Sequence, residues 1–117
     1  MDSRLLLLAA LILTSCSLQH DVSNVVLPGT NISVSVIEDE KSIYHYCIHE
    51  NNKSCSDGRE FGVRAGQRPR GAQLPTAVVT KNGDVATITW PGTSLRVLID
   101  VVRGRAIGDS NGVPMPP

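Results

Sequence analysis

The dipeptide Asn82-Gly83 joins two strand-like runs, and this hairpin signal limits the fold more than any other feature of the chain. The runs are residues 76–81 and 84–90. Asn-Gly is favoured in two-residue hairpin loops, and alternation with a period of two is typical of a strand with one buried face. With Asn82-Gly83 as the loop, Val79 lies opposite Ala86. We therefore predict an antiparallel hairpin whose core face holds Ala77, Val79, Ala86, Ile88 and Trp90.

Residues 95–102 extend this hairpin into a β-meander. They follow the turn pair Pro91-Gly92 and are rich in β-branched side chains, which favour strands. Upstream, residues 32–36 and 42–49 alternate in the same way, whereas the Gly, Pro and Asn content of residues 50–75 is typical of a loop. We predict a mostly β protein with a single small antiparallel β domain. One face of the third meander strand holds Leu95, Val97, Ile99 and Val101, and one face of residues 42–49 holds Tyr44, Tyr46 and Ile48.

The composition of the chain argues against some classes of binding partner. A length of 117 residues gives room for one domain, and the formal net charge is zero. A balanced charge argues against nucleic acid as a partner, because such binding requires many cationic contacts to phosphate. Aromatic residues make up 3% of the chain, so we expect an aliphatic core and no aromatic platform for stacking sugars or bases.

The N-terminal segment has the form of an export signal. Arg4 precedes the apolar run 5–13, which is much shorter than the roughly 20 residues of a membrane-spanning helix. The run ends in Leu13-Thr14-Ser15-Cys16, which resembles the lipobox of bacterial lipoproteins. The resemblance implies cleavage before Cys16, diacylglycerol on its sulfur and acylation of the new amino group. Because Ser17 follows, rather than the Asp of inner-membrane retention signals, it implies the outer membrane, facing the periplasm or the surface.

This interpretation divides the chain into four parts. We expect a signal peptide at 1–15, the lipidated Cys16 and a flexible tether at 16–31, the β-rich domain at 32–107 and a disordered tail at 108–117. Two alternatives remain open for the N-terminus. An ordinary secretory signal cut near Ser17 or His20 would give a soluble secreted protein, and a buried helix would give no export at all.

Two cysteines remain when Cys16 is assigned to the lipid. In an oxidising compartment, Cys47 and Cys55 are most simply explained as a disulfide, and the short loop they close would contribute somewhat under about 3 kcal/mol of stability. Alternatively, His45, Cys47 and His49 project from one face of a strand and are candidate ligands for zinc or copper. Free thiols are the third alternative.

The long loop carries a basic cluster. Arginine forks match phosphate and carboxylate groups, so this loop is a candidate site for an envelope protein or an anionic envelope polymer such as lipopolysaccharide or peptidoglycan. A solvated loop without a partner is the alternative interpretation. The candidate residues are Arg59, Arg64, Arg68 and Arg70.

The sequence gives no reason to pair any serine, histidine or acid for catalysis, so we expect no enzymatic activity and no cofactor. The predicted function is that of a membrane-anchored envelope lipoprotein acting by protein or envelope contacts. The layout is also similar to that of small lipoproteins that inhibit C-type lysozyme, and Cys47 with residues 57–63 is similar to their early strands. The Ser-Gly-x-x-Tyr segment that those inhibitors insert into the lysozyme cleft has no counterpart in the sequence. A periplasmic metal-binding protein is the remaining alternative.

Overall fold

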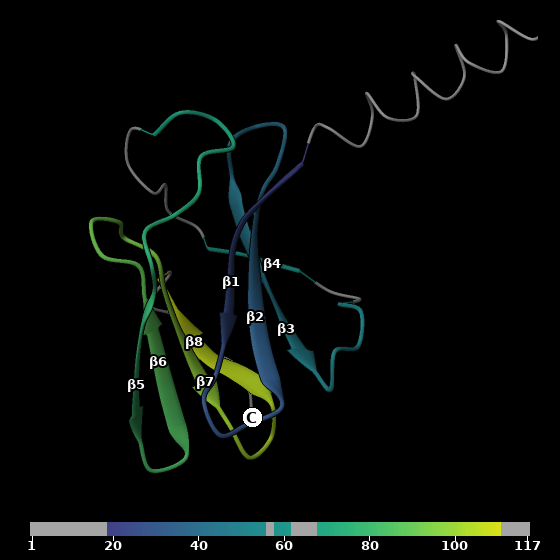
Figure 1. The fold of residues 1–117 in the computed structure, drawn as a ribbon, viewed down its shortest axis with the longest axis vertical. Coiled ribbons are helices and arrows are strands. Elements are labelled where there is room, and N and C mark those ends of the chain that lie inside the picture. The colour runs from purple at the N-terminus through teal and green to yellow at the C-terminus, as the bar shows by residue number, and fades with distance from the viewer. Residues whose placement is uncertain (1–18, 56–57, 62–67, 111–117) are drawn as a thin grey trace, which may run out of the picture.

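The computed structural model describes residues 19–55, 58–61 and 68–110, which form two four-stranded antiparallel sheets (Figure 1). The first sheet contains β1 (His20–Val26), β2 (Ile32–Glu38), β3 (Tyr44–Glu50) and β4 (Arg59–Glu60), in that order. The second contains β5 (Val78–Asn82), β6 (Val85–Thr89), β7 (Arg96–Asp100) and β8 (Arg105–Asp109). Within each sheet the strands pair in the order of the sequence, and the described residues contain no helix. The predicted small antiparallel β fold is confirmed.

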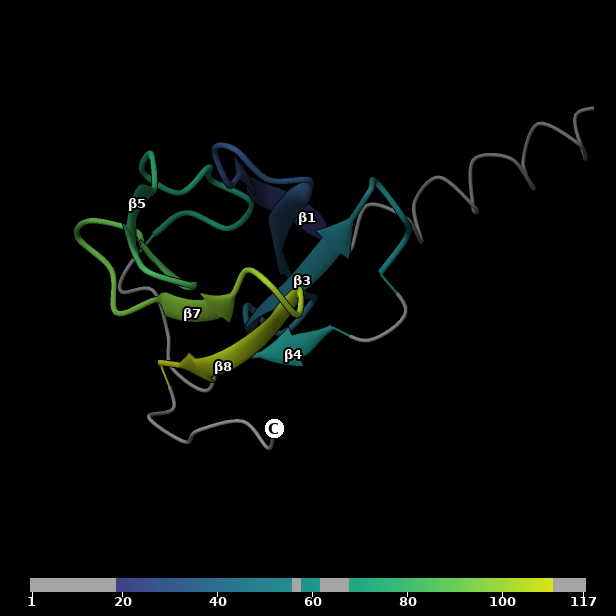
Figure 2. The same ribbon diagram turned by 90° about the horizontal axis from the view of Figure 1, so that it is seen from below.

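The two sheets enclose a shared apolar interior (Figure 2). The Trp90 ring, at the end of β6, meets the Phe61 ring edge-on at a centroid distance of 5.8 Å, and Phe61 in turn lies 4.8 Å from the Tyr46 ring. Two side-chain hydrogen bonds also join the sheets. Trp90 Nε1 donates to Ser23 Oγ at 2.9 Å in a partly buried position, and the Tyr46 hydroxyl donates to Asp109 Oδ2 at 2.9 Å in a buried one. The few aromatic side chains of the chain therefore form the centre of the core.

The hairpin predicted around Asn82-Gly83 is present, but its register differs from the prediction by two residues. Asn82 pairs with Val85, so Gly83-Asp84 is the two-residue loop. Gly83 has a φ of 61°, whereas Asn82 keeps a strand conformation. Glycine at the first loop position is typical of a type II′ turn, which needs only one residue with positive φ. A shift of two residues keeps each side chain on its face, so the predicted core face is confirmed: Ala86, Ile88 and Trp90 are buried, and Ala77 and Val79 pack against the core.

Strand β1 corrects the expected tether at 16–31. A β-bulge between Asp21 and Ser23 inserts an extra residue into this strand. As a result, Val22 and Val25 both face the core although they are three residues apart. The alternation that marks a half-buried strand is broken by the bulge, so the sequence of β1 resembles an irregular linker.

Strand β8 likewise extends two residues into the segment expected to be a tail at 108–117. Within it, Ala106 and Asp109 are buried. A register shift in its pairing with β7 breaks the alternation, which hid this strand from sequence analysis.

Several predicted features lie outside the described residues. They are the signal peptide at 1–15, the lipidated Cys16, Arg64 and residues 111–117. Among the residues that are described, no helix is long and apolar enough to cross a membrane.

Candidate functional site

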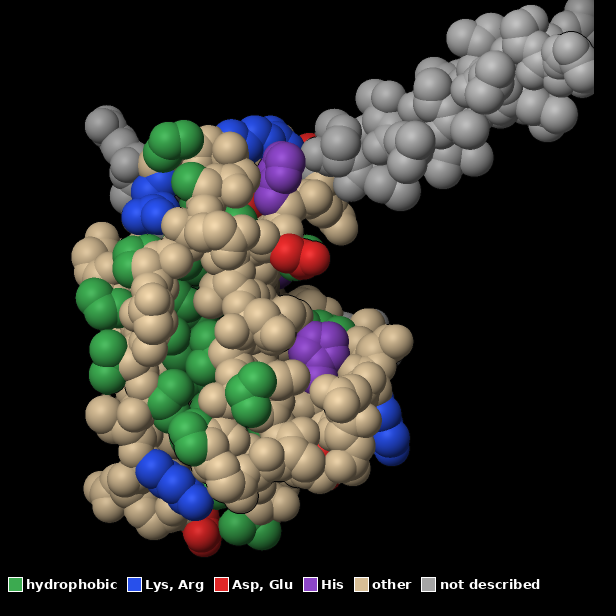
Figure 3. All heavy atoms as spheres, viewed as in Figure 1, with side chains coloured by type: hydrophobic (Ala, Val, Ile, Leu, Met, Phe, Trp, Pro, Cys, Tyr) green, Lys and Arg blue, Asp and Glu red, His purple; other side chains and the backbone are tan. Residues whose placement is uncertain are grey.

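The outward face of the first sheet carries a groove with a volume of about 580 Å³. Its floor lies on β1, β2 and β3, whose inward side chains are mostly apolar while their outward side chains are mostly polar. Figure 3 shows that the surface over β1 and β2 is mostly uncharged polar side chains and backbone. The described residues that line the groove are all of polar types: Asp21, Ser23, Asn24, Ser33, Ser35, His49, Asn52 and Gln73.

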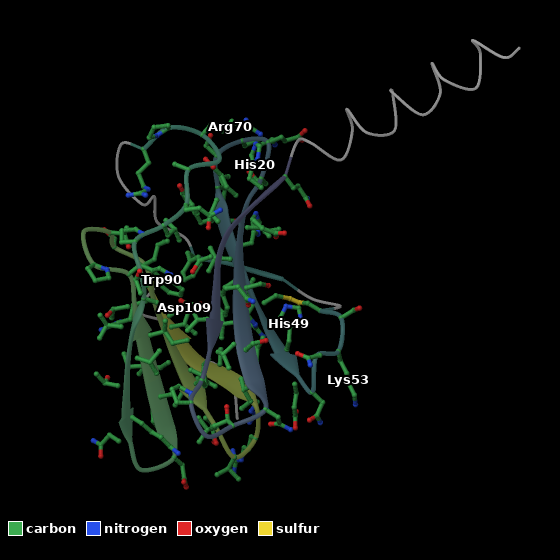
Figure 4. All side chains as sticks on the ribbon, in the orientation of Figure 1. His20, His49, Lys53, Arg70, Trp90 and Asp109 are labelled. Atoms are coloured by element: carbon green, nitrogen blue, oxygen red, sulfur yellow. A yellow bond between two sulfur atoms is a disulfide. The ribbon has the colours of Figure 1, made fainter. Side chains whose placement is uncertain are left out.

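Ser35 and His49 form a hydrogen-bonded pair in this groove. Ser35 Oγ lies 2.8 Å from His49 Nε2, and His49 Nδ1 lies 2.8 Å from the Lys53 carbonyl oxygen. A carbonyl oxygen can only accept, so the neutral imidazole carries its proton on Nδ1. Nε2 is then the acceptor, and the Ser35 hydroxyl donates to it. Figure 4 shows His49 and Lys53 on the same side of the sheet.

The loop after β3 positions the Lys53 carbonyl. Asn51 and Asn52 have φ angles of 56° and 60°, and asparagine tolerates this left-handed region better than most residues. They turn the chain back over the outward face of β3, and the Lys53 amide donates to the Glu50 carbonyl at 3.2 Å. The orientation of the His49 ring is therefore set by local turn chemistry.

A disulfide between Cys47 and Cys55 holds the same loop, as the sequence predicted. The Cα atoms are 5.9 Å apart, within the usual range for disulfides. Cys47 lies on β3 two residues before His49, on the same outward face. The disulfide thus connects the far end of the loop to the strand that carries the histidine.

The structure does not bring His45, Cys47 and His49 together as metal ligands. His45 Nε2 lies 2.8 Å from Asp39 Oδ2, Cys47 is paired with Cys55, and His49 contacts Ser35. In the described part of the chain, no group of three or more His, Cys, Asp or Glu residues is arranged to hold a metal ion.

Asp39 organises the turn between β2 and β3. Its Oδ1 accepts hydrogen bonds from the amides of Lys41 at 2.8 Å and Ile43 at 3.0 Å, while Oδ2 faces His45. The hydrogen bond from His45, and then the one from the Ile43 amide, lower the pKa of the Asp39 carboxyl from its usual 3.8. The Asp39–His45 pair is therefore part of a turn and lies outside the groove lining.

The described arginines of the basic cluster have separate locations. Arg70 donates to the carbonyl oxygens of Glu40 at 2.5 Å and Asp39 at 3.2 Å, and Arg68 donates to that of Gln73 at 2.5 Å. Arg59 lies on β4 and is exposed. Arg70 thus fastens the long loop to the β2–β3 turn of the first sheet, and Arg68 bonds within the loop. Binding of an anionic partner by the four arginines stays a prediction.

The Ser35–His49 pair cannot be recognised from a sequence motif, because no linear motif contains both residues. The only available signal was the alternation of residues 32–36 and 42–49, which places both side chains on outward faces once the strands are paired. A Gly-x-Ser-x-Gly spacing does occur at residues 108–112. Its central Ser110 contacts backbone instead: its Oγ accepts from the Arg96 amide at 2.6 Å and donates to the Arg96 carbonyl at 3.3 Å.

Comparisons with protein-family models, curated proteins and solved structures found no match to this chain. Its function is therefore inferred from its own residues and their geometry.

Proposed function

We propose that this chain is a lipid-anchored protein of the cell envelope, attached through Cys16 and acting by contacts of its β domain with an envelope polymer. The lipobox-like sequence and the Cys47–Cys55 pair support export, because disulfides persist in oxidising compartments. Strand β1 begins at His20, four residues after Cys16. A fully extended chain of that length spans about 14 Å, so the anchor would hold the sheet close to the membrane surface.

The polar groove on the first sheet is the observation that carries this proposal. Amide, hydroxyl and imidazole groups line it, and Asp21 is the one acidic residue among the described residues of the lining. The part of the lining that the structure describes contains no Lys or Arg, so its chemistry fits a ligand that is uncharged and rich in hydrogen-bonding groups. The glycan strand of the cell wall is an envelope polymer with this chemistry, and we propose it as the ligand.

The anchor is tested by expressing the full chain in a bacterial host and analysing the purified protein by intact mass spectrometry. We expect cleavage before Cys16 and an added mass equal to diacylglycerol plus one fatty acid. The Cys16→Ala variant is the control and should lose the lipid mass and leave the membrane fraction. Recovery of wild type with its leader intact and no lipid would contradict the proposal.

Binding is tested by sedimenting the lipidated protein, in detergent, with purified insoluble cell-wall sacculi. A lost hydrogen bond costs about 0.5–1.5 kcal/mol, so the double variant Asn24→Ala/Ser33→Ala should bind about tenfold more weakly. Thr80→Ala is the matched control, because Thr80 is exposed on β5 of the other sheet. Equal sedimentation of both variants, or none by wild type, would refute the role of the groove.

A further inference from the structure

We propose that Ser35 is a nucleophile for acyl transfer and that His49 is its general base. This inference goes beyond the proposed function, which requires only binding. The expectation that the chain has no enzymatic activity rested on the lack of any reason to pair a serine with a histidine. The Ser35–His49 contact of 2.8 Å across two strands supplies that reason.

The direction of the hydrogen bonds matches the one that a serine nucleophile needs. His49 Nδ1–H is held by the Lys53 carbonyl, which leaves Nε2 free of a proton and aimed at the Ser35 hydroxyl. A base oriented by a third group is the general arrangement of an activated serine. Here a backbone carbonyl is that third group, and the disulfide to Cys55 holds its loop against the strand.

Asn24 is placed to stabilise the charge that develops during acyl transfer. It lies directly opposite Ser35 in the β1–β2 ladder, and both side chains line the groove. Side chains in such pairs share a face, with Cβ atoms about 4.5–5.5 Å apart. A side-chain amide at this distance from the nucleophile is of the type that donates to an oxyanion.

The lining of the groove indicates the class of substrate. Among the residues that the structure describes there, none is apolar and suited to hold a long acyl chain, and Asp21 disfavours anionic substrates. These features fit a short acyl ester, such as an acetyl ester, of a hydroxyl-rich alcohol. The acyl group would lie at Ser35 and the alcohol would contact the amides of the groove.

The reaction has two balanced steps. Ser35 Oγ bonds to the ester carbonyl carbon while its proton moves to His49 Nε2. The ester C–O bond then breaks, and the departing alcohol takes that proton. In the second step, water gives a proton to Nε2 and its oxygen bonds to the acyl carbon. The released Ser35 oxygen recovers the proton, and the acyl group leaves as a carboxylic acid.

The test uses the disulfide-bonded protein with two probes, a fluorophosphonate that labels activated serines and 4-nitrophenyl acetate. We expect peptide mass spectrometry to find the label on Ser35 and acetate release to be catalytic. Ser35→Ala should abolish both. His49→Ala should slow both by at least about a hundredfold, the usual contribution of a general base, and added imidazole should restore part of the rate. Asn24→Ala should slow acetate release by about a hundredfold.

Thr80→Ala is the control, because Thr80 is exposed on β5 of the other sheet and lies outside the groove lining. It should keep the wild-type rate. Absence of label on wild-type Ser35, a rate unchanged in Ser35→Ala, or a loss in His49→Ala that imidazole does not restore would overturn the proposal. Sedimentation with sacculi separates the two proposals, because wild-type protein that binds sacculi but releases no acetate would contradict the acyl transfer alone.

Discussion

The hydrogen bond from the Tyr46 hydroxyl to Asp109 connects the two sheets, and its removal should measurably weaken the fold. Tyr46 lies on β3 and Asp109 on β8, and they are 2% and 3% exposed. The donor–acceptor distance is 2.9 Å. Burial of the phenol, with a smaller contribution from the Asp109 carboxylate, raises the pKa of Tyr46 above its usual value of 10.0. The hydroxyl therefore remains a proton donor throughout the ordinary pH range.

Tyr46→Phe removes this donor and keeps the ring that lies 4.8 Å from Phe61. A hydrogen bond to a charged acceptor contributes about 1.5–3 kcal/mol, and the variant leaves a buried carboxylate with one donor fewer. We expect a loss of about 2 kcal/mol in the free energy of unfolding. For a domain of this size, the melting temperature should fall by about 8–16 °C.

The assay is urea denaturation followed by the fluorescence of Trp90, which is the only tryptophan and is buried. Tyr44→Phe is the control. Tyr44 is also buried on β3, and its hydroxyl makes no hydrogen bond within the part of the chain that the structure describes. A double-mutant cycle with Asp109→Ala should give a coupling energy of about 1–2 kcal/mol.

Two results would refute this reasoning. One is a loss in Tyr46→Phe no larger than that in Tyr44→Phe. The other is a coupling energy near zero between Tyr46→Phe and Asp109→Ala, which would show that the two side chains act independently.

Three further predictions concern the turns and the loop. Gly83→Ala should lower the free energy of unfolding by about 1–2 kcal/mol, because a φ of 61° is strained for alanine, although the added Cβ would meet nothing within 4 Å. An unchanged melting temperature would contradict this prediction. The lowered pKa of Asp39 gives stability that is present above its usual 3.8 and is lost as pH falls through the folded value. In urea denaturation at pH 7, Asp39→Asn should therefore have a lower free energy of unfolding than wild type, and this difference should narrow at pH 3. A difference that is the same at both pH values would exclude the contact with His45 as its cause. Replacing Cys47 and Cys55 by alanine should cost about 2.5 kcal/mol in the same urea assay, and no loss would mean that the bridge does not constrain the unfolded chain.

Regular alternation made most of the fold predictable. Residues 32–36, 42–49 and 76–102 alternate because each strand buries one face, and β2, β3, β5, β6 and β7 lie within or close to those ranges. The bulge in β1 and the register shift at β8 break the period of two, and these two strands were missed. The pattern also left the hairpin register open by two residues, because such a shift leaves the buried face unchanged.

The same ambiguity explains why the groove could not be derived from the sequence. Ser35 stands opposite Cys47 in the β2–β3 ladder, which places it diagonally next to His49. A slip of two residues in the direction that shortens the β2–β3 turn would keep both core faces apolar and yet put Ser35 opposite His45, away from the Lys53 carbonyl. The hydrophobic pattern therefore selects the face on which these side chains lie but not their neighbours. The turn at 39–43 sets the register. In it, the Asp39 amide donates to the Ile43 carbonyl at 2.9 Å, and Ser42 adopts a φ of 63°.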